Sequence, residues 1–423
     1  MVYNGPMNVY FSGIGGVGIG PLAQIAHDAG YDVSGSDTTH SLMTDELESM
    51  GISVSYDQSG EFLRSQHANQ KIGWFVHTAA LPDNHPELTT ARDLGIKTAK
   101  RDELLAEIIQ QKNLKLIAVA GTHGKTTTTG MLVWAMQQLG VAVSYSVGTT
   151  LSWGPSGHFE PGSEYFIYEC DEFDRNFLHF QPYLSLITAL DYDHPDTYPT
   201  IESYREAFVQ FLSQSDHSLI WEKDLRYLHQ ADIEASYEAF DELMDLSHIT
   251  LAGNHTRHNA FLVERALDRL LPGVNVLSAV NSFPGTNRRF EKLVDGLYSD
   301  YGHHPSEIAA TIQMARELSD HVVLVYQPHQ NIRQHDIQDD YTNELFAGVE
   351  KIFWLPTYLS REDPGLDILT PEELTRSLTT AEVADFDDKL WNCIQRHIDE
   401  GNLVLCMGAG SIDEWVRKQV AKG

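Results

Sequence analysis

Residues 114–129, LKLIAVAGTHGKTTTT, decide the fold. The apolar, β-rich run from Leu114 to Ala120 predicts a buried strand, and the residues from Thr126 to Leu139 predict a helix. The glycine turn between them predicts a loop whose backbone N–H groups surround phosphate oxygens at the start of the helix. The stretch therefore indicates a nucleotide-phosphate site in an α/β domain.

Seven consecutive residues form the predicted phosphate loop: Gly121, Thr122, His123, Gly124, Lys125, Thr126 and Thr127. The ammonium of Lys125 can reach the terminal phosphates, and the hydroxyl of Thr126 can hold Mg²⁺. The loop departs from the common G-x-x-x-x-G-K-[ST] pattern, because Val119 stands where the first glycine would be. We expect Gly121 to make the turn tighter than usual.

Acidic residues follow two later strand-like runs. Glu169 to Asp174 come at the end of the predicted strand 165–169, and Asp191 to Asp196, which include His194, follow the apolar run 184–188. Mg²⁺ prefers carboxylate and water ligands. Beside a phosphate loop, at least one of these carboxylates is expected to serve a metal, although acidic loops of this kind are often only solvated.

A second glycine turn lies near the N-terminus. Gly13 to Gly18 follow the predicted strand 8–12 and precede the predicted helix 20–30, a position in which glycines let the backbone approach a pyrophosphate. Asp37, after the second strand, suits a ribose contact. These residues alone leave open a dinucleotide-dependent dehydrogenase and a tight turn without any ligand.

Strand-like and helix-like segments alternate along the whole chain, which predicts parallel sheets covered by helices. In a chain of 423 residues we expect three α/β domains, with boundaries at 1–106, 107–284 and 285–423. The third contains the apolar runs 322–326, 351–355 and 402–407.

Composition limits the partners. The chain carries 29 basic and 60 acidic residues, a net charge of −31, which disfavours nucleic acid and anionic membrane surfaces. Its N-terminus lacks an export signal, and its three cysteines match no zinc or disulfide spacing. We expect a cytoplasmic protein with small-molecule substrates and no membrane partner. The sequence does not predict the oligomeric state.

Taken in order, the motifs resemble the Mur ligase family over nearly the whole chain, most closely its branch that joins L-alanine to UDP-N-acetylmuramate. The matching segments are residues 13–18, 34–37, 121–129, 169–174, 193–198, 300–305, 327–329 and 407–410. The loop Gly121 to Thr129 agrees with the family pattern at every position.

The resemblance implies an ATP-dependent ligase that joins L-alanine to the carboxylate of UDP-N-acetylmuramate through an acyl phosphate, with ATP and Mg²⁺ as cofactors, in peptidoglycan precursor synthesis. It implies a UDP-sugar-binding Rossmann-like domain at 1–106, a P-loop-type central ATPase domain at 107–284 and a Rossmann-like, amino-acid-binding C-terminal domain at 285–423. Closure of the domains would assemble the site. The dehydrogenase interpretation is thereby displaced.

The resemblance also implies residue roles. The catalytic residues would be Lys125, His194 and Arg289, and the metal ligands Thr126, Glu169 and His194. ATP would be contacted by His255, Asn259 and Arg289 in addition to the residues of the phosphate loop. Gly15, Gly16, Gly18, Asp37 and His303 would contact substrates.

Several positions depart from the family pattern. Thr256 replaces an asparagine, and Gln330-Asn331 replace the usual Arg-Tyr. The stretch from Ser213 to Thr250 is short, and we expect it to lack the strands that complete the central sheet. Two other functions therefore stay open: a ligase that attaches a preformed peptide to UDP-N-acetylmuramate in wall recycling, and a nucleotide-binding homologue without catalysis.

Overall fold

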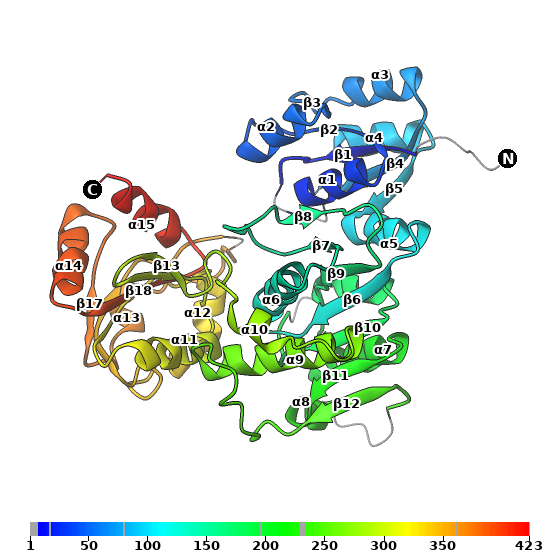
Figure 1. The fold of residues 1–423 in the computed structure, drawn as a ribbon. Coiled ribbons are helices and arrows are strands. Elements are labelled where there is room, and N and C mark those ends of the chain that lie inside the picture. The colour runs from blue at the N-terminus through cyan, green and yellow to red at the C-terminus, as the bar shows by residue number, and fades with distance from the viewer. Residues whose placement is uncertain are drawn as a thin grey trace. The chain divides into compact units, whose positions relative to one another are not determined.

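The computed structural model describes residues 7–16, 18–78, 81–194, 197–228, 233–360 and 362–422. Within these residues, three sheets of five, seven and six strands follow one another along the chain (Figure 1). Contacts divide the chain into two compact units, Met1–Asp245 with Ala260–Phe283, and Leu246–Asn259 with Pro284–Gly423. The predicted α/β fold of three domains is confirmed. The boundaries between the domains stay predictions.

The first sheet is parallel, in the order β3-β2-β1-β4-β5. Its strands are β1 (Asn8–Ser12), β2 (Asp32–Ser36), β3 (Ser53–Ser55), β4 (Ile72–His77) and β5 (Lys97–Lys100), and its helices are α1 (Gly20–Asp28), α2 (Leu42–Ser49), α3 (Glu61–Asn69), α4 (Pro86–Asp93) and α5 (Arg101–Gln111). Because side chains alternate along a strand, Tyr10 packs with residues of α3 and α4, while Val9 and Phe11 share a core with α1 and α5.

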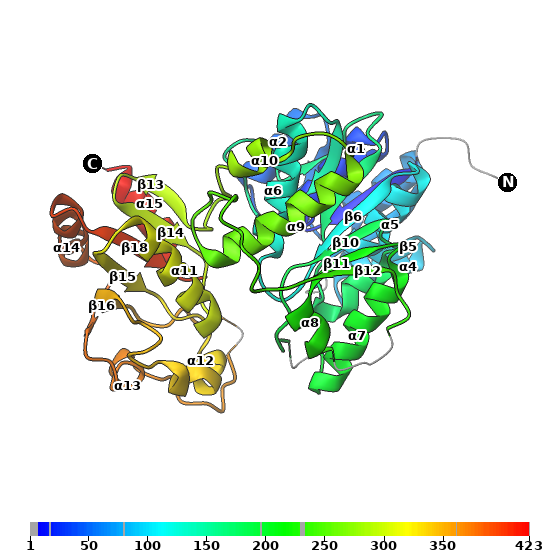
Figure 2. The same ribbon diagram turned by 60° about the horizontal axis from the view of Figure 1, so that its bottom comes forward.

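The central sheet has the order β12-β11-β10-β6-β9-β7-β8, and only the edge pair β7–β8 is antiparallel among its described strands. Its strands are β6 (Lys115–Ala120), β7 (Val143–Ser146), β8 (Gly157–His158), β9 (Tyr165–Glu169), β10 (Leu184–Ile187), β11 (Ser218–Trp221) and β12 (Tyr237–Phe240). Its helices are α6 (Lys125–Gln138), the 3₁₀ helix η1 (Phe173–His179), α7 (Ile201–Gln214), α8 (Glu222–Tyr227), α9 (Asn254–Leu270) and α10 (Leu277–Asn281). Figure 2 shows α6, α9 and α10 on one side of this sheet and α7 and α8 on the other.

The expectation that residues 213–250 lack sheet strands is wrong. β11 and β12 both lie in this stretch and extend the sheet beyond β10 by parallel pairing. The side chains of Leu219, Ile220 and Trp221 are completely buried. Each strand has only four residues, too few for a periodic pattern to stand out from the sequence.

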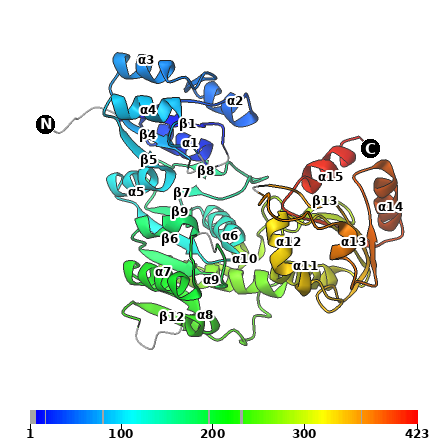
Figure 3. The same ribbon diagram turned by 180° about the vertical axis from the view of Figure 1, so that it is seen from behind.

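The third sheet has the order β13-β14-β18-β15-β16-β17, with β13 antiparallel to β14 and the other pairs parallel (Figure 2). Figure 3 shows the helices of this domain from behind. Its strands are β13 (Glu291–Val294), β14 (Leu297–Asp300), β15 (Val322–Tyr326), β16 (Val349–Trp354), β17 (Ala381–Val383) and β18 (Leu403–Met407). The helices α11 (Pro305–Leu318), α12 (Asn331–Ile337) and α13 (Pro371–Leu374) contribute to the core on one face, and α14 (Asp388–Asp399) and α15 (Ile412–Val420) cover the other. The short 3₁₀ helix η2 (Gln338–Asp340) follows α12 and has no buried residue.

The three cysteines are free thiols. Cys170 and Cys406 are buried, and Cys393, on α14, is partly exposed. In the described part of the chain, no helix is both long and apolar enough to cross a membrane.

Candidate active site

The phosphate loop lies at the point where the order of the central sheet reverses. It follows β6, whose neighbours β9 and β10 come later in the chain on either side. In parallel α/β sheets ligands bind at the carboxyl ends of the strands at such a point. The loops after β6, β9 and β10 therefore meet there, which brings residues 121–127, 169–174 and 188–194 together.

Two glycines give the loop its shape. Gly121 has φ +136°, and a Cβ at this position would lie 2.5 Å from the Thr188 hydroxyl, so a larger residue does not fit. Gly124 has φ +85° where α6 begins. Two hydrogen bonds tie the loop to the segment after β10: the N–H of Thr122 donates to the carbonyl of Ala189 at 2.7 Å, and the side-chain hydroxyl of Thr188 donates to the carbonyl of His123. The predicted loop residue Thr127 lies in the first turn of α6.

Lys125, the first residue of α6, is held by the loop and by an acid. Its Nζ donates to the carbonyl of Gly121 at 2.6 Å and to Oε2 of Glu172 at 2.7 Å. Burial alone would lower the pKa of Lys125, but the negative charges of Glu172, Asp171 and Glu169 raise it above its ordinary value. The side chain therefore stays a cation at the phosphate loop.

Thr126 and Glu169, both predicted metal ligands, are in direct contact. The Thr126 hydroxyl donates to Oε1 of Glu169 at 2.8 Å, and Oε2 accepts from the N–H of Gly148 at 2.9 Å. A Cβ on Gly148 would lie 2.6 Å from that carboxylate, so a glycine is needed beside it. A hydroxyl and a carboxylate oxygen at this edge are ligands that suit a hard cation.

His194 lies close to two acidic side chains, those of Asp171 and Glu172. One ligand atom each from Asp171, Glu172 and His194 lie within 4.8 Å of one another. Glu172 is completely buried, and its Oε1 has no hydrogen-bond partner among the residues that the structure describes, although His194 Nε2 lies 3.7 Å away. The sequence singled out Glu169 and His194 but not Glu172. The position of Glu172 in the acidic segment after β9 was the sequence signal that could have indicated it. Only its burial in the folded protein distinguishes Glu172 from the neighbouring acids.

The N-terminal glycine turn lies at the corresponding reversal point of the first sheet, after β1. The carbonyl of Ser36 accepts hydrogen bonds from the N–H groups of Gly13 and Ile14, at 2.8 and 2.9 Å. Oδ2 of Asp37 accepts from the N–H of Gly15 at 2.8 Å. Asp37 thus stabilises the turn itself, and its predicted contact with a uridine stays a prediction.

Beneath this turn a carboxylate is completely buried. Glu87, in the first turn of α4, accepts hydrogen bonds from the hydroxyls of Tyr10 (2.6 Å), Ser12 (2.6 Å) and Ser36 (2.8 Å). Ser12 directly precedes Gly13, and Ser36 directly precedes Asp37. One side chain therefore holds both the residue before the glycine turn and the residue before Asp37. No sequence motif indicated this role of Glu87.

Four predicted site residues belong to the second compact unit. His255 and Asn259 lie at the start of α9, Arg289 lies before β13, and His303 follows β14. The Arg289 guanidinium lies 5.1 Å from the centre of the Tyr301 ring. Burial lowers the pKa of His303 to about 4, so its imidazole is neutral at pH 7. The predicted contacts of these residues with ATP and substrate stay predictions.

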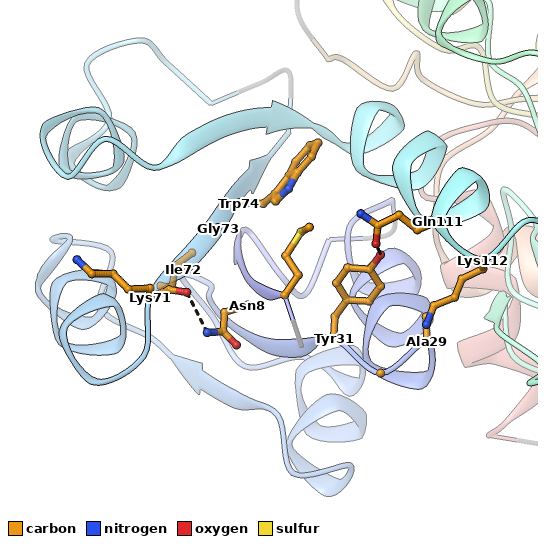
Figure 4. A pocket seen from close by; sticks show the side chains of 11 residues that line it. Asn8, Ala29, Tyr31, Lys71, Ile72, Gly73, Trp74, Gln111 and Lys112 are labelled. Atoms are coloured by element: carbon orange, nitrogen blue, oxygen red, sulfur yellow. Dashed lines mark hydrogen bonds between the residues drawn. The ribbon is translucent and has the colours of Figure 1, made fainter. Parts of the chain in front are cut away.

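A separate cavity of about 460 Å³ lies at the opposite edge of the first sheet (Figure 4). It is lined by Asn8 and Ile72, at the amino ends of β1 and β4, with Tyr31, Trp74 and Gln111 around them. The hydroxyl of Tyr31 donates to Oε1 of Gln111 at 2.6 Å. None of the predicted site residues lines this cavity, so it is not the site that the motifs describe.

A phosphate loop and its carboxylates at one reversal point, and a glycine turn at another, define a multidomain nucleotide-dependent enzyme of the α/β class. The models of the Mur ligase family, catalytic domain, and of the Mur ligase middle domain match residues 8–113 and 119–248. The chain is 32% identical to the UDP-N-acetylmuramate–L-alanine ligase of Porphyromonas gingivalis strain W83, over 96% of this chain and 97% of that protein. The chain belongs to the Mur ligase family.

Other relatives agree. The UDP-N-acetylmuramate–L-alanine ligase of Jannaschia sp. strain CCS1 is 30% identical over 96% of this chain and 94% of its own length. The crystal structure of UDP-N-acetylmuramate-alanine ligase from Thermotoga maritima has a TM-score of 0.75 at 23% identity, covering 98% of this chain and 99% of that one. The murein peptide ligase of Psychrobacter arcticus has a TM-score of 0.66 at 20% identity, with 98% of each chain covered. As a member of this family the chain is an ATP-dependent ligase that forms an amide bond.

Proposed function

We propose that this enzyme joins L-alanine to the carboxylate of UDP-N-acetylmuramate, with release of ADP and phosphate, in peptidoglycan precursor synthesis. The observation that carries the proposal is the identity of 30–32% to ligases of that name over 96% of this chain. The phosphate loop and the glycine turn supply a site for each of the two nucleotide substrates. We also propose a cytoplasmic location.

The reaction has two steps. A carboxylate oxygen of UDP-N-acetylmuramate attacks the γ-phosphorus of ATP, and ADP leaves as the acyl phosphate forms. The amine of L-alanine then attacks the acyl carbon, loses a proton, and expels inorganic phosphate. In the first step the negatively charged carboxylate of the substrate must approach the negatively charged phosphates of ATP. Lys125 counters this charge at the phosphate loop, and Arg289 is proposed to do so from the C-terminal domain.

Mg²⁺ would be held by Thr126, Glu169 and His194. The residues fit a hard cation, because oxygen ligands dominate and no group in the described part of the chain forms a hydrogen bond with the buried Oε1 of Glu172. Asp171 and Glu172 lie within reach of the same position as His194. When bound, the ion would neutralise phosphate charge and orient the terminal phosphate.

The remaining roles follow the domain division at 1–106, 107–284 and 285–423. His255 and Asn259 would contact the adenine, and residues 121–127 the phosphates of ATP. Gly15, Gly16, Gly18 and Asp37 would bind the UDP moiety, and His303 the acceptor in the C-terminal domain. The neutral imidazole of His303 can accept a hydrogen bond from an ammonium or amine.

The test is to incubate the protein with ATP, Mg²⁺ and UDP-N-acetylmuramate, add single amino acids in turn, and measure ADP and the coupled product. We expect L-alanine to give the highest kcat/KM. Lys125→Ala is the inactive variant; it should keep the wild-type circular dichroism spectrum at the assay temperature, although its unfolding temperature should fall because buried Glu172 loses its partner. Absence of amino-acid-dependent ADP release across the panel would contradict the proposal.

A second candidate is a ligase for preformed peptides, since a murein peptide ligase shares the fold over 98% of the chain. The substitution of Gln330-Asn331 for Arg-Tyr falls in the C-terminal domain, where the acceptor would bind. The same assay with L-alanyl-γ-D-glutamyl-meso-diaminopimelate in place of L-alanine separates the two. Tight ATP binding without ADP formation with either acceptor would instead favour a non-catalytic homologue.

A further inference from the structure

We propose that Arg101 binds the diphosphate of the uridine nucleotide and so determines the preference of the N-terminal domain for a diphosphate ligand. This inference rests on the proposed use of the Gly13 to Gly18 turn for a UDP-sugar. Arg101 lies more than eighty residues from that turn in sequence, at the first position of α5. It is absent from the motifs that identified the turn.

Arg101 lies directly against the glycine turn. A Cβ added to Gly18 would be 2.9 Å from Nη1 of Arg101, so the guanidinium closely covers the backbone there. About a third of the side chain, 32%, is exposed, which leaves it accessible to a ligand. A phosphate that approaches the backbone of the turn would therefore also meet this cation.

The glycine turn requires a nearby positive charge if it is to bind a diphosphate. The N–H of Gly15 already donates to Oδ2 of Asp37, so that amide is engaged and a negative charge stands beside it. A diphosphate brought to the same turn would be repelled by Asp37 unless a positive charge offsets it. Arg101 can supply that charge and can donate two parallel hydrogen bonds to phosphate oxygens.

Arg101 is held in place by buried groups. Its Nη2 lies 3.4 Å from Oδ1 of Asp102, whose side chain is only 3% exposed. The hydroxyl of Tyr168, on β9, donates a hydrogen bond to the same oxygen of Asp102. This chain of contacts ties the guanidinium to the central sheet, so little ordering would be required when a ligand binds.

The position also suits a substrate that runs from one domain to the next. Helix α5 contacts both α1 of the N-terminal sheet and η1, which begins within the acidic segment after β9. Asp171 of that segment acts electrostatically on Arg101. The cation therefore lies between the glycine turn and the carboxylates near the phosphate loop, along the route a UDP-sugar would take to present its carboxylate to ATP.

The experiment measures the affinity of the full-length protein for UDP-N-acetylmuramate, UDP, UMP and uridine by isothermal titration calorimetry. In Arg101→Ala we expect roughly a 10- to 100-fold loss of affinity for UDP and UDP-N-acetylmuramate, since a hydrogen bond to a charged group is lost. Uridine should bind the variant and the wild type equally. Arg101→Lys should recover part of the loss, because a point charge remains without the paired geometry.

The matched control is Arg92→Ala, which removes the same charge from α4 of the same domain, where Arg92 pairs with exposed Asp83. It should leave all four affinities unchanged. Equal weakening of all ligands by Arg101→Ala, uridine included, would show a structural role and overturn the inference. So would unchanged affinity for UDP, or wild-type protein that binds none of the four. Wild-type binding without amino-acid-dependent ADP release would overturn the proposed function alone.

Discussion

Nζ of Lys125 lies 2.7 Å from Oε2 of Glu172, and the carboxylate is completely buried. The pair joins the start of α6 to the acidic segment after β9, and His194 lies on the other side of the same carboxylate. The cation that we propose for the ATP phosphates is thus positioned by a protein anion. The position of Lys125 depends on the acid as much as on the glycine loop.

We expect Glu172→Gln to destabilise the protein and to reduce turnover. Removing one member of a buried ion pair leaves the other charge without compensation, at a cost of about 3–5 kcal/mol. A displaced Lys125 should lower kcat by roughly 100-fold or more. Thermal unfolding and ADP release measure the two effects. The control is Asp174→Asn in the same segment, because Asp174 pairs with Lys100 at a site where both side chains are about 40% exposed. Equal behaviour of the two variants would contradict this role of Glu172.

Thr126→Val should raise the Mg²⁺ concentration required for half-maximal activity by roughly 10-fold, since a proposed ligand oxygen is lost while the volume is kept. Thr126→Ser should restore it. A Mg²⁺ titration of ADP release at saturating ATP is the measurement. Thr129→Val is the control, because that hydroxyl, one turn along α6, donates to the backbone carbonyl of Lys125. An identical Mg²⁺ dependence in all variants would remove Thr126 from the metal site.

Glu87→Ala should destabilise the N-terminal domain and weaken binding of the UDP-sugar. The hydroxyls of Tyr10, Ser12 and Ser36 would lose their common acceptor, and each unsatisfied buried donor costs about 1–3 kcal/mol. Because Ser12 and Ser36 adjoin the glycine turn and Asp37, KM for the UDP-sugar should rise while KM for ATP stays constant. Glu61→Ala, an exposed change on α3, is the control. A parallel rise in both KM values would indicate general loosening of the protein.

The C-terminal domain should lose stability as the pH falls from 7 towards 4. Burial lowers the pKa of His303 from 6.5 to about 4, so the unfolded chain takes up a proton before the folded protein does. The free energy of unfolding therefore decreases as the pH falls from about 6.5 to about 4. Urea unfolding at pH 7, 6 and 5 should show a weaker pH dependence in His303→Gln than in the wild type.

His321 provides a control of opposite sign. Its hydrogen bond to Glu350 raises its pKa, so the stability that it contributes is present at low pH and is lost as the pH rises. His321→Gln should therefore not reduce the loss of stability on acidification. Identical slopes for the wild type and His303→Gln would show that His303 is not responsible.

The sequence predicted those elements whose pattern is local. Strands 8–12, 165–169 and 322–326 lie where they were predicted, because continuous apolar runs between turn residues have few alternatives. The phosphate loop was recognisable because its glycines and Lys125 are adjacent in sequence. The four-residue strands β11 and β12 were missed, since short runs gain their stability from neighbours in the sheet.

Residues that depend on distant partners could not be predicted in the same way. Glu87 is separated by 51 residues from Ser36 and by 75 from Ser12, and nothing in its immediate surroundings marks a buried acid. Arg101 lies beside Gly18 only because α5 follows β5 at the edge of the sheet. Among the carboxylates after β9, burial rather than identity distinguishes Glu172.

The unequal burial of the three cysteines makes the native protein suitable for single-site labelling. Cys170 and Cys406 are enclosed by the sheets, whereas Cys393 is partly exposed on α14, outside the predicted site. A maleimide dye should therefore attach to the C-terminal domain at one position without prior removal of other thiols. Fluorescence from that dye can follow the response of this domain to each substrate in real time.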